Sequence, residues 1–204
     1  MKRELTPFQL AGLLAVIGIL FSLISSRIPV AIPNISPLMA IAFVGAMYLP
    51  RRWGWTIGPV ILVIVNLAYR ATNYRVYGDM LSWNLVGCLA VFAFAGGLGT
   101  WIASHKSLGK IIAGSLTCSL LFYVVSNTFS WWTYQTPQFA DGYAPTAAGW
   151  LQANTYGIPG FPPTWHFLRN AMAGDLFFVF VLLLILDRRV IFGQAPAKTS
   201  TQAA

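Results

Sequence analysis

Polar and charged side chains capable of chemistry interrupt some of the most apolar stretches of this chain. The segment FLRNAMAGDLFFVFVLLLILDRR (167–189) carries Arg169, Asn170 and Asp175 ahead of eleven consecutive apolar residues. Asn34 and Asn127 interrupt two further apolar stretches. An ionised group inside hydrocarbon costs a few kcal/mol, so Asp175 requires either a partner or a function. A few amide, carboxylate and guanidinium groups in an apolar surrounding are suited to binding a small polar solute.

Signatures of catalysis are missing from the same sequence. It contains neither the G-x-x-x-x-G-K-[ST] phosphate-binding loop nor the H-E-x-x-H metal motif, and its two histidines are His105 and His166. Cys88 and Cys118 have no further cysteine or histidine at metal-ligand spacing. We therefore expect a protein that is not an enzyme and that has no cofactor, no metal site and no catalytic residue.

The composition is that of a membrane protein. Of the 204 residues, 57% are hydrophobic and 9% are charged, whereas soluble domains carry about 25% charged residues. We expect an all-α membrane protein in contact with membrane lipid, with residues 1–192 forming one transmembrane domain and 193–204 a disordered tail. The net charge of +8 is not accompanied by a basic stripe or a recognition motif, so no nucleic-acid partner is expected.

Six apolar segments are candidates for membrane-crossing helices, and together they predict a bundle of about six helices. The second segment is interrupted by Pro29, Pro33 and Pro37, so its helix either crosses the membrane as a short tilted span or re-enters on the same side. A long loop, 131–166, precedes the last helix. The predicted helices are Phe8–Ser25, Leu38–Leu49, Trp55–Tyr69, Trp83–Ala103, Lys110–Ser130 and Phe167–Leu186.

The distribution of lysine and arginine predicts the orientation of such a bundle. With six spans, both termini lie on one side of the membrane. Nine of the 13 basic residues fall on that side, and the four on the other are Arg27, Arg70, Arg75 and Arg169. Because basic residues collect on the cytoplasmic side, both termini and the tail are expected to be cytoplasmic.

The polar residues inside the predicted spans then fall in the outer half of the membrane. Their convergence near one depth predicts a cavity for a solute, and the alternative is hydrogen bonding that only holds helices together. Arg169 and Asp175 are six residues apart, about 120° around a helix, so each is expected to bond another helix or a loop. The polar residues considered are Asn34, Asn66, Asn127, Arg169, Asn170 and Asp175.

The loop 131–166 is rich in aromatic residues, among them Trp131, Tyr143 and Trp150. It is too aromatic for a disordered linker. Two arrangements are open: an ordered lid whose rings turn inward over a pocket, or rings that lie in the headgroup belt.

Four stretches of the chain resemble a family of small, uncharacterised bacterial integral membrane proteins usually labelled as transport proteins. The shared pattern runs from Pro-Asn-x-[ST]-Pro through an Asn and a Trp to Tyr-x-x-Thr-x-x-Gly and Arg-Asn-x-x-x-Gly-Asp. The matching stretches are PNISPLMAIAFVGAMYL (33–49), SNTFSWW (126–132), YAPTAAGW (143–150) and FLRNAMAGDLFF (167–178).

The resemblance implies a protein of the bacterial plasma membrane that binds a small solute. In size and layout the family is similar to the substrate-binding S components of energy-coupling-factor transporters, which bind their ligand under outer loops and dock an energising subunit on an A-x-x-x-A face. Ala11 and Ala15 fit that face, by analogy of layout alone. The alternative function is a structural or accessory membrane subunit. The expected solute-binding residues are Asn34, Asn127, Trp131, Tyr143, Thr146, Arg169, Asn170 and Asp175.

Overall fold

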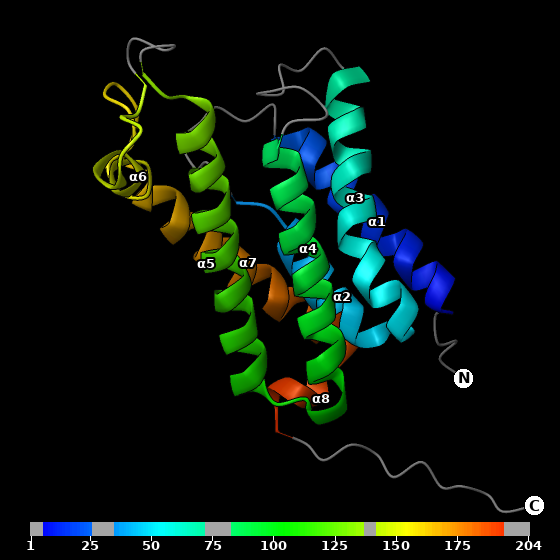
Figure 1. Cartoon of the computed structure of the whole chain (residues 1–204). Coiled ribbons are helices and arrows are strands. Elements are labelled where there is room, and N and C mark those ends of the chain that lie inside the picture. The colour runs from blue at the N-terminus through cyan, green and yellow to red at the C-terminus, as the bar shows by residue number, and fades with distance from the viewer. Residues whose placement is uncertain (1–5, 26–34, 72–82, 137–141, 194–204) are drawn as a thin grey trace, which may run out of the picture.

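The computed structural model describes residues 6–25, 35–71, 83–136 and 142–193, and these are predominantly helical (Figure 1). No β-strand occurs within these ranges, where one isolated bridge pairs Gln135 with Tyr143. The expected site residue Asn34 and the tail 194–204 lie outside the described residues. The helices are α1 (Pro7–Ser25), α2 (Leu38–Tyr48), α3 (Arg51–Ala71), α4 (Trp83–Ile102), the 3₁₀ turn η1 (Ala103–His105), α5 (Leu108–Thr133), α6 (Ala147–Ala153), α7 (Trp165–Leu186) and α8 (Arg188–Ile191).

Three helices of the described chain, α4 with η1, α5 and α7, are long and apolar enough to cross a membrane. The segments Gln9–Phe21 of α1 and Leu38–Tyr48 of α2 are apolar but shorter. Trp83 and Trp101 lie near the two ends of α4 and are 70% and 71% exposed. Their separation of 18 residues corresponds to about 27 Å of helix, close to the thickness of a bilayer core of about 30 Å. The prediction of an all-helical protein is confirmed for the described residues, and each predicted segment overlaps a helix. The three long apolar helices support a membrane protein.

Helix α2 forms the centre of the bundle, although it is only 11 residues long. Every residue from Met39 to Met47 is buried, and α2 contacts α1, α3, α4, α5 and α7. At 1.5 Å per residue it measures about 16 Å, roughly half the depth of the hydrocarbon. Pro37 directly precedes the helix, where the missing amide hydrogen of proline removes no intrahelical hydrogen bond.

Two glycines of α4 bring this helix against the backbones of its neighbours. A Cβ atom on Gly96 would collide with the carbonyl oxygen of Gly54 in α3, and one on Gly99 with the carbonyl oxygen of Phe43 in α2. Small residues allow such close approach of membrane helices. The GGLG motif (96–99) is therefore a packing element, as its position inside an apolar run suggests.

One end of the bundle, here called the basic end, carries the start of α3, the α4–α5 turn and α8 (Figure 1). Lys106 in the turn donates to Asp187 after α7 at 3.2 Å, and its ammonium lies 4.1 Å from the centre of the Tyr48 ring of α2. The Tyr48 hydroxyl is 3.4 Å from the same carboxylate oxygen. These contacts join the ends of α2, α4 and α7. The cationic residues of this end are Arg51, Arg52, Lys106, Lys110, Arg188 and Arg189.

Candidate functional site

The Asp175 carboxyl group lies buried between α5 and α7 and is 5% exposed. The Ser119 hydroxyl of α5 donates to Asp175 Oδ2 at 2.6 Å, and it also lies 3.0 Å from the carbonyl oxygen of Ser115. Among the described residues no lysine, arginine or histidine pairs with this carboxyl group. Within the part of the chain that the structure describes, one hydroxyl donates to one of its oxygens, and a carboxylate can accept further hydrogen bonds.

Ser119 belongs to a line of polar and aromatic residues along α5, here called the α5 column. The first three members are almost fully buried, at 2%, 1% and 7% exposure, and the last two are half-buried. Residues four apart in a helix are displaced by only about 40° around it, so such a series follows one slowly turning face. The column consists of Ser115, Ser119, Tyr123, Asn127 and Trp131.

The candidate site residues do not lie at one depth, and this corrects the expectation from the sequence. Asp175 is the eleventh of the 22 residues of α7, at the middle of that helix rather than near its end. Asn127 lies eight residues beyond Ser119 on α5, a separation of about 12 Å. The polar groups therefore form a column that runs from the middle of the bundle toward the α6 end. Each residue of a helix lies about 1.5 Å further along the axis, so residues eight apart are at different depths.

Arg169 is not a partner of Asp175. Its Nε and Nη2 atoms both donate to Asn170 Oδ1 at 3.3 Å, and its guanidinium lies 5.8 Å from the centre of the Trp165 ring. The expectation that the two charges do not form a local pair is confirmed, and Asp175 bonds another helix as predicted. For Arg169, the expectation of a bond to another helix or loop stays a prediction, since its bonds among the described residues are to its neighbour Asn170. Its side chain is exposed near the start of α7.

The segment 142–164 covers the end of α5 that is remote from the basic end. Three aromatic side chains hold the segment against α5 by hydrogen bonds. Trp131 Nε1 of α5 donates to the Ala144 carbonyl at 2.9 Å, and Tyr123 Oη of α5 donates to the Asn154 carbonyl at 2.7 Å. Trp150 Nε1 of the segment donates to Thr128 Oγ1 of α5 at 2.9 Å. In Figure 1, α6 lies beside this end of α5 and away from α1 and α3. The segment covers the α5–α7 side and not the whole bundle.

The aromatic residues of this segment divide between the two arrangements that the sequence left open. Tyr143 is 5% exposed, and burial raises the pKa of its phenol, with the neighbouring Tyr123 acting in the same direction. Tyr156 and Phe161 are 74% and 69% exposed, as in a headgroup belt. A lid-like inner face and a belt-like outer face therefore occur in one segment.

Two further residues of the cover differ in what they can offer a ligand. The Thr146 hydroxyl is used as the N-cap of α6, accepting from the Gly149 amide at 3.2 Å, which accounts for the Tyr-x-x-Thr-x-x-Gly pattern by local structure. Asn154 Oδ1, in contrast, is buried and has no hydrogen-bond partner among the described residues. Because its own backbone carbonyl accepts from Tyr123, Asn154 adds an unsatisfied acceptor beside the α5 column.

The structure brings part of the expected site together and leaves part of it apart. Asn127 and Trp131 share the α5 column, while Asn66 donates to the Leu62 carbonyl of its own helix at 2.8 Å. Four residues were not anticipated from the sequence: Ser115, Ser119, Tyr123 and Asn154. The first three could have been found from the four-residue spacing that links them to Asn127 and Trp131.

The buried polar groups of this arrangement determine which hydrogen bonds it can make. Its buried groups are a carboxyl group, hydroxyls and an amide oxygen, most of them acceptors. No group of three or more metal-ligating side chains occurs in the described ranges. A donor-bearing polar molecule is the complement of such a set.

Comparison with known proteins places the chain in a family. Neither a curated protein nor a solved structure matches it significantly. Residues 7–190, which include every element of the candidate site, match the family model DUF6580. The chain therefore belongs to DUF6580, a family of unknown function.

Proposed function

We propose that this protein binds a small solute between α5 and α7 and is the substrate-binding component of a transporter. The observation that carries the proposal is the buried Asp175 carboxyl group at the middle of an apolar helix, with no cationic partner in the described chain. Polar groups at membrane depth are expensive to bury and commonly mark solute pathways. The α5 column extends from this carboxyl group to the cover formed by residues 142–164.

The proposed topology has six passes, with both termini in the cytoplasm of a bacterium. The three long apolar helices supply three passes, and α1, α2 and α3 with their flanking residues are proposed to supply the others. The basic residues carried by the elements at one end of the bundle support a cytoplasmic basic end. The α5 column then opens toward the outside.

The energy for transport is proposed to come from a partner subunit that docks on α1. Ala11 and Ala15 are partly buried against the core, and the opposite face of α1 is exposed. A partner would therefore contact the margin of the Ala11–Ala15 face together with this exposed stripe. The exposed residues are Leu13, Val16, Ile17, Leu20 and Ile24.

A structural or accessory role is the second candidate function, and the Ser119–Asp175 hydrogen bond favours it. The same bond that presents a carboxyl group to a solute also joins α5 to α7. Interhelical hydrogen bonds of this kind contribute about 0.6 kcal/mol on average in membrane proteins.

The experiment that separates the two functions is native mass spectrometry of the purified protein and of an Asp175→Asn variant. A solute-binding component retains a small molecule that the variant loses while its fold is preserved, since asparagine keeps the size and an acceptor oxygen but removes the charge. If neither protein carries or takes up a small molecule, and Asp175→Asn only loosens the bundle, the accessory role is correct.

A further inference from the structure

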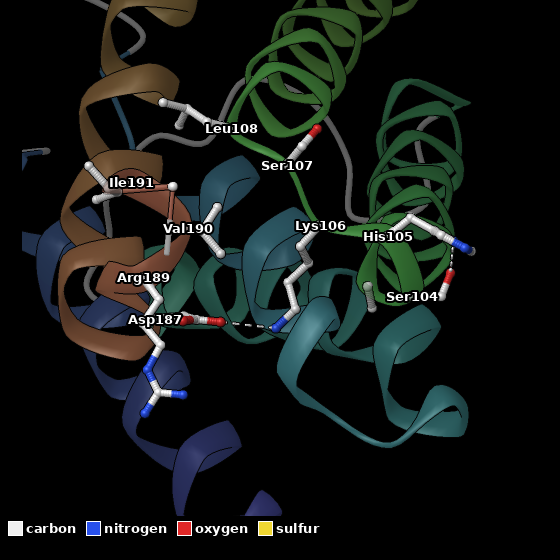
Figure 2. Close-up of a pocket in the computed structure, with 11 residues that line it drawn as sticks. Ser104, His105, Lys106, Ser107, Leu108, Asp187, Arg189, Val190 and Ile191 are labelled. Atoms are coloured by element: carbon white, nitrogen blue, oxygen red, sulfur yellow. Dashed lines mark hydrogen bonds and ion pairs between the residues drawn. The ribbon is translucent and has the colours of Figure 1, made fainter. Parts of the chain in front are cut away.

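A cavity of about 740 Å³ lies at the basic end, apart from the candidate solute site. Figure 2 shows its two sides, with Ser104 and His105 of the α4–α5 connection on one and Asp187 and Arg189 near α8 on the other. Lys106 reaches between them to Asp187. The cavity is thus formed by segments about 80 residues apart in the sequence, as the Lys106–Asp187 separation of 81 shows.

The cavity has more positive than negative charge. The one carboxylate on its wall, Asp187, is neutralised by Lys106 at 3.2 Å. Arg189 is exposed, and among the described residues no carboxylate pairs with it. The Ser107 hydroxyl accepts from the Lys110 amide and keeps its own hydrogen to donate. Figure 2 shows Arg189 and His105 on opposite sides of the cavity, with the His105 imidazole 2.9 Å from the Ser104 hydroxyl. The uncompensated Arg189 guanidinium is the group suited to an oxyanion such as a phosphate group.

The remaining wall is apolar and lies where the helices leave the hydrocarbon. Leu108, Val190 and Ile191 line it. The apolar run of α7 ends at Leu186, and Trp101 and Phe192 near this end are 71% and 64% exposed, as side chains facing lipid headgroups are. A ligand that fits both walls has an anionic head and an apolar body.

We propose that this cavity binds the headgroup of an anionic phospholipid, with the phosphate at Arg189 and the glycerol and upper acyl chains against Leu108, Val190 and Ile191. Basic pockets between membrane helices on the cytoplasmic side are suited to such headgroups. The bound lipid would bridge the α4–α5 connection and α8, which the Lys106–Asp187 ion pair already joins. This proposal does not depend on solute binding.

The test compares two neighbouring arginines of α8. Both are exposed, but only Arg189 lines the cavity, so Arg188→Gln is a matched control for Arg189→Gln. Detergent-purified full-length protein is titrated with phosphatidylglycerol or phosphatidylcholine, and bound lipid is counted by native mass spectrometry. Size-exclusion chromatography checks that each variant is folded.

We expect the protein to bind phosphatidylglycerol more tightly than phosphatidylcholine. Arg189→Gln should weaken the affinity for phosphatidylglycerol about five-fold, which is the effect of about one cation at a membrane surface. Arg188→Gln should change it less than two-fold. Equal losses in the two variants would show attraction to a diffuse positive surface and overturn the site. Inorganic phosphate binding with no preference among lipids would overturn the lipid assignment.

Discussion

The Ser119 hydroxyl donates to Asp175 Oδ2 at 2.6 Å and joins the middle of α5 to the middle of α7. The two residues are 56 positions apart in the sequence, and both are buried. Removal of the two partners therefore has different consequences. Removing the Ser119 hydroxyl leaves the Asp175 carboxyl group without its donor, whereas removing the carboxyl group leaves only a neutral hydroxyl.

Replacing Ser119 by Ala should destabilise the fold by about 1–3 kcal/mol, the penalty for a buried polar group that loses its partner. Thr117→Ala is the matched control, since Thr117 is exposed and its hydroxyl bonds only the Ala113 carbonyl of its own helix. Thermal unfolding in detergent, followed by circular dichroism, measures the difference. An equal effect of the two substitutions would show that the interhelical bond is not formed.

Removing the Asp175 carboxyl group as well should restore much of the stability that Ser119→Ala loses. The double substitution Ser119→Ala, Asp175→Leu removes both polar groups, and replacing a buried polar pair by apolar residues is often close to neutral. We expect the double variant to unfold at a higher temperature than Ser119→Ala alone. If it also transports and binds as the original protein does, Asp175 has no role in solute recognition.

Replacing Gly99 by Ala should weaken the bundle, because the new methyl group would collide with the Phe43 carbonyl of α2 and force the helices apart. Overpacking of this kind typically costs about 1–3 kcal/mol. Gly109→Ala is the control, since nothing lies within 4 Å of the added atom and alanine is the better helix former. A protease-resistance assay over a temperature series should rank Gly99→Ala below the original protein and Gly109→Ala level with it or above.

Alkaline pH should loosen the cover of the α5 column. Burial raises the pKa of Tyr143 in the folded state above its ordinary value of about 10. A raised folded-state pKa means that the folded protein holds this proton more tightly, so the contribution to stability is present below about pH 10 and declines as pH rises through the folded value. Hydrogen exchange of α6 should therefore speed up more above pH 10 than base catalysis of exchange alone predicts.

The matched pair of variants for this pH dependence is Tyr143→Phe and Tyr156→Phe. Phenylalanine at position 143 has no phenol to ionise, so Tyr143→Phe should remove the excess exchange. Tyr156 is 74% exposed, so Tyr156→Phe should leave the excess exchange unchanged. If the excess exchange above pH 10 persists in Tyr143→Phe, the ionisation of another group causes it.

The two ends of the bundle should react on opposite sides of the membrane. Single cysteines placed at Ser104, in the α4–α5 connection, and at Ala147, at the start of α6, are both exposed. In a background with Cys88 and Cys118 replaced by alanine, a membrane-impermeant maleimide applied to intact cells should label position 147 and not 104. The reverse pattern would invert the proposed orientation.

Composition and local order were sufficient to predict a helical membrane protein and the positions of its helices. A chain with 57% hydrophobic and 9% charged residues has too few polar groups to face water, and apolar runs between prolines and polar loops set helix limits because backbone groups in lipid must bond within the helix. The angular separation of Arg169 and Asp175 is also a local property, so their failure to pair was predictable.

Only the tertiary structure decided which side chains meet. Helices that are apolar on every side carry no stripe that indicates their inward face, so the sequence could not show that α2 is enclosed by five neighbours or that Ser119 bonds Asp175. Burial of Tyr143 and exposure of Tyr156 likewise depend on how the cover folds back onto α5. The cavity between the α4–α5 connection and α8 exists because rotations and crossings of whole helices bring distant segments together, and these are set by packing between helices.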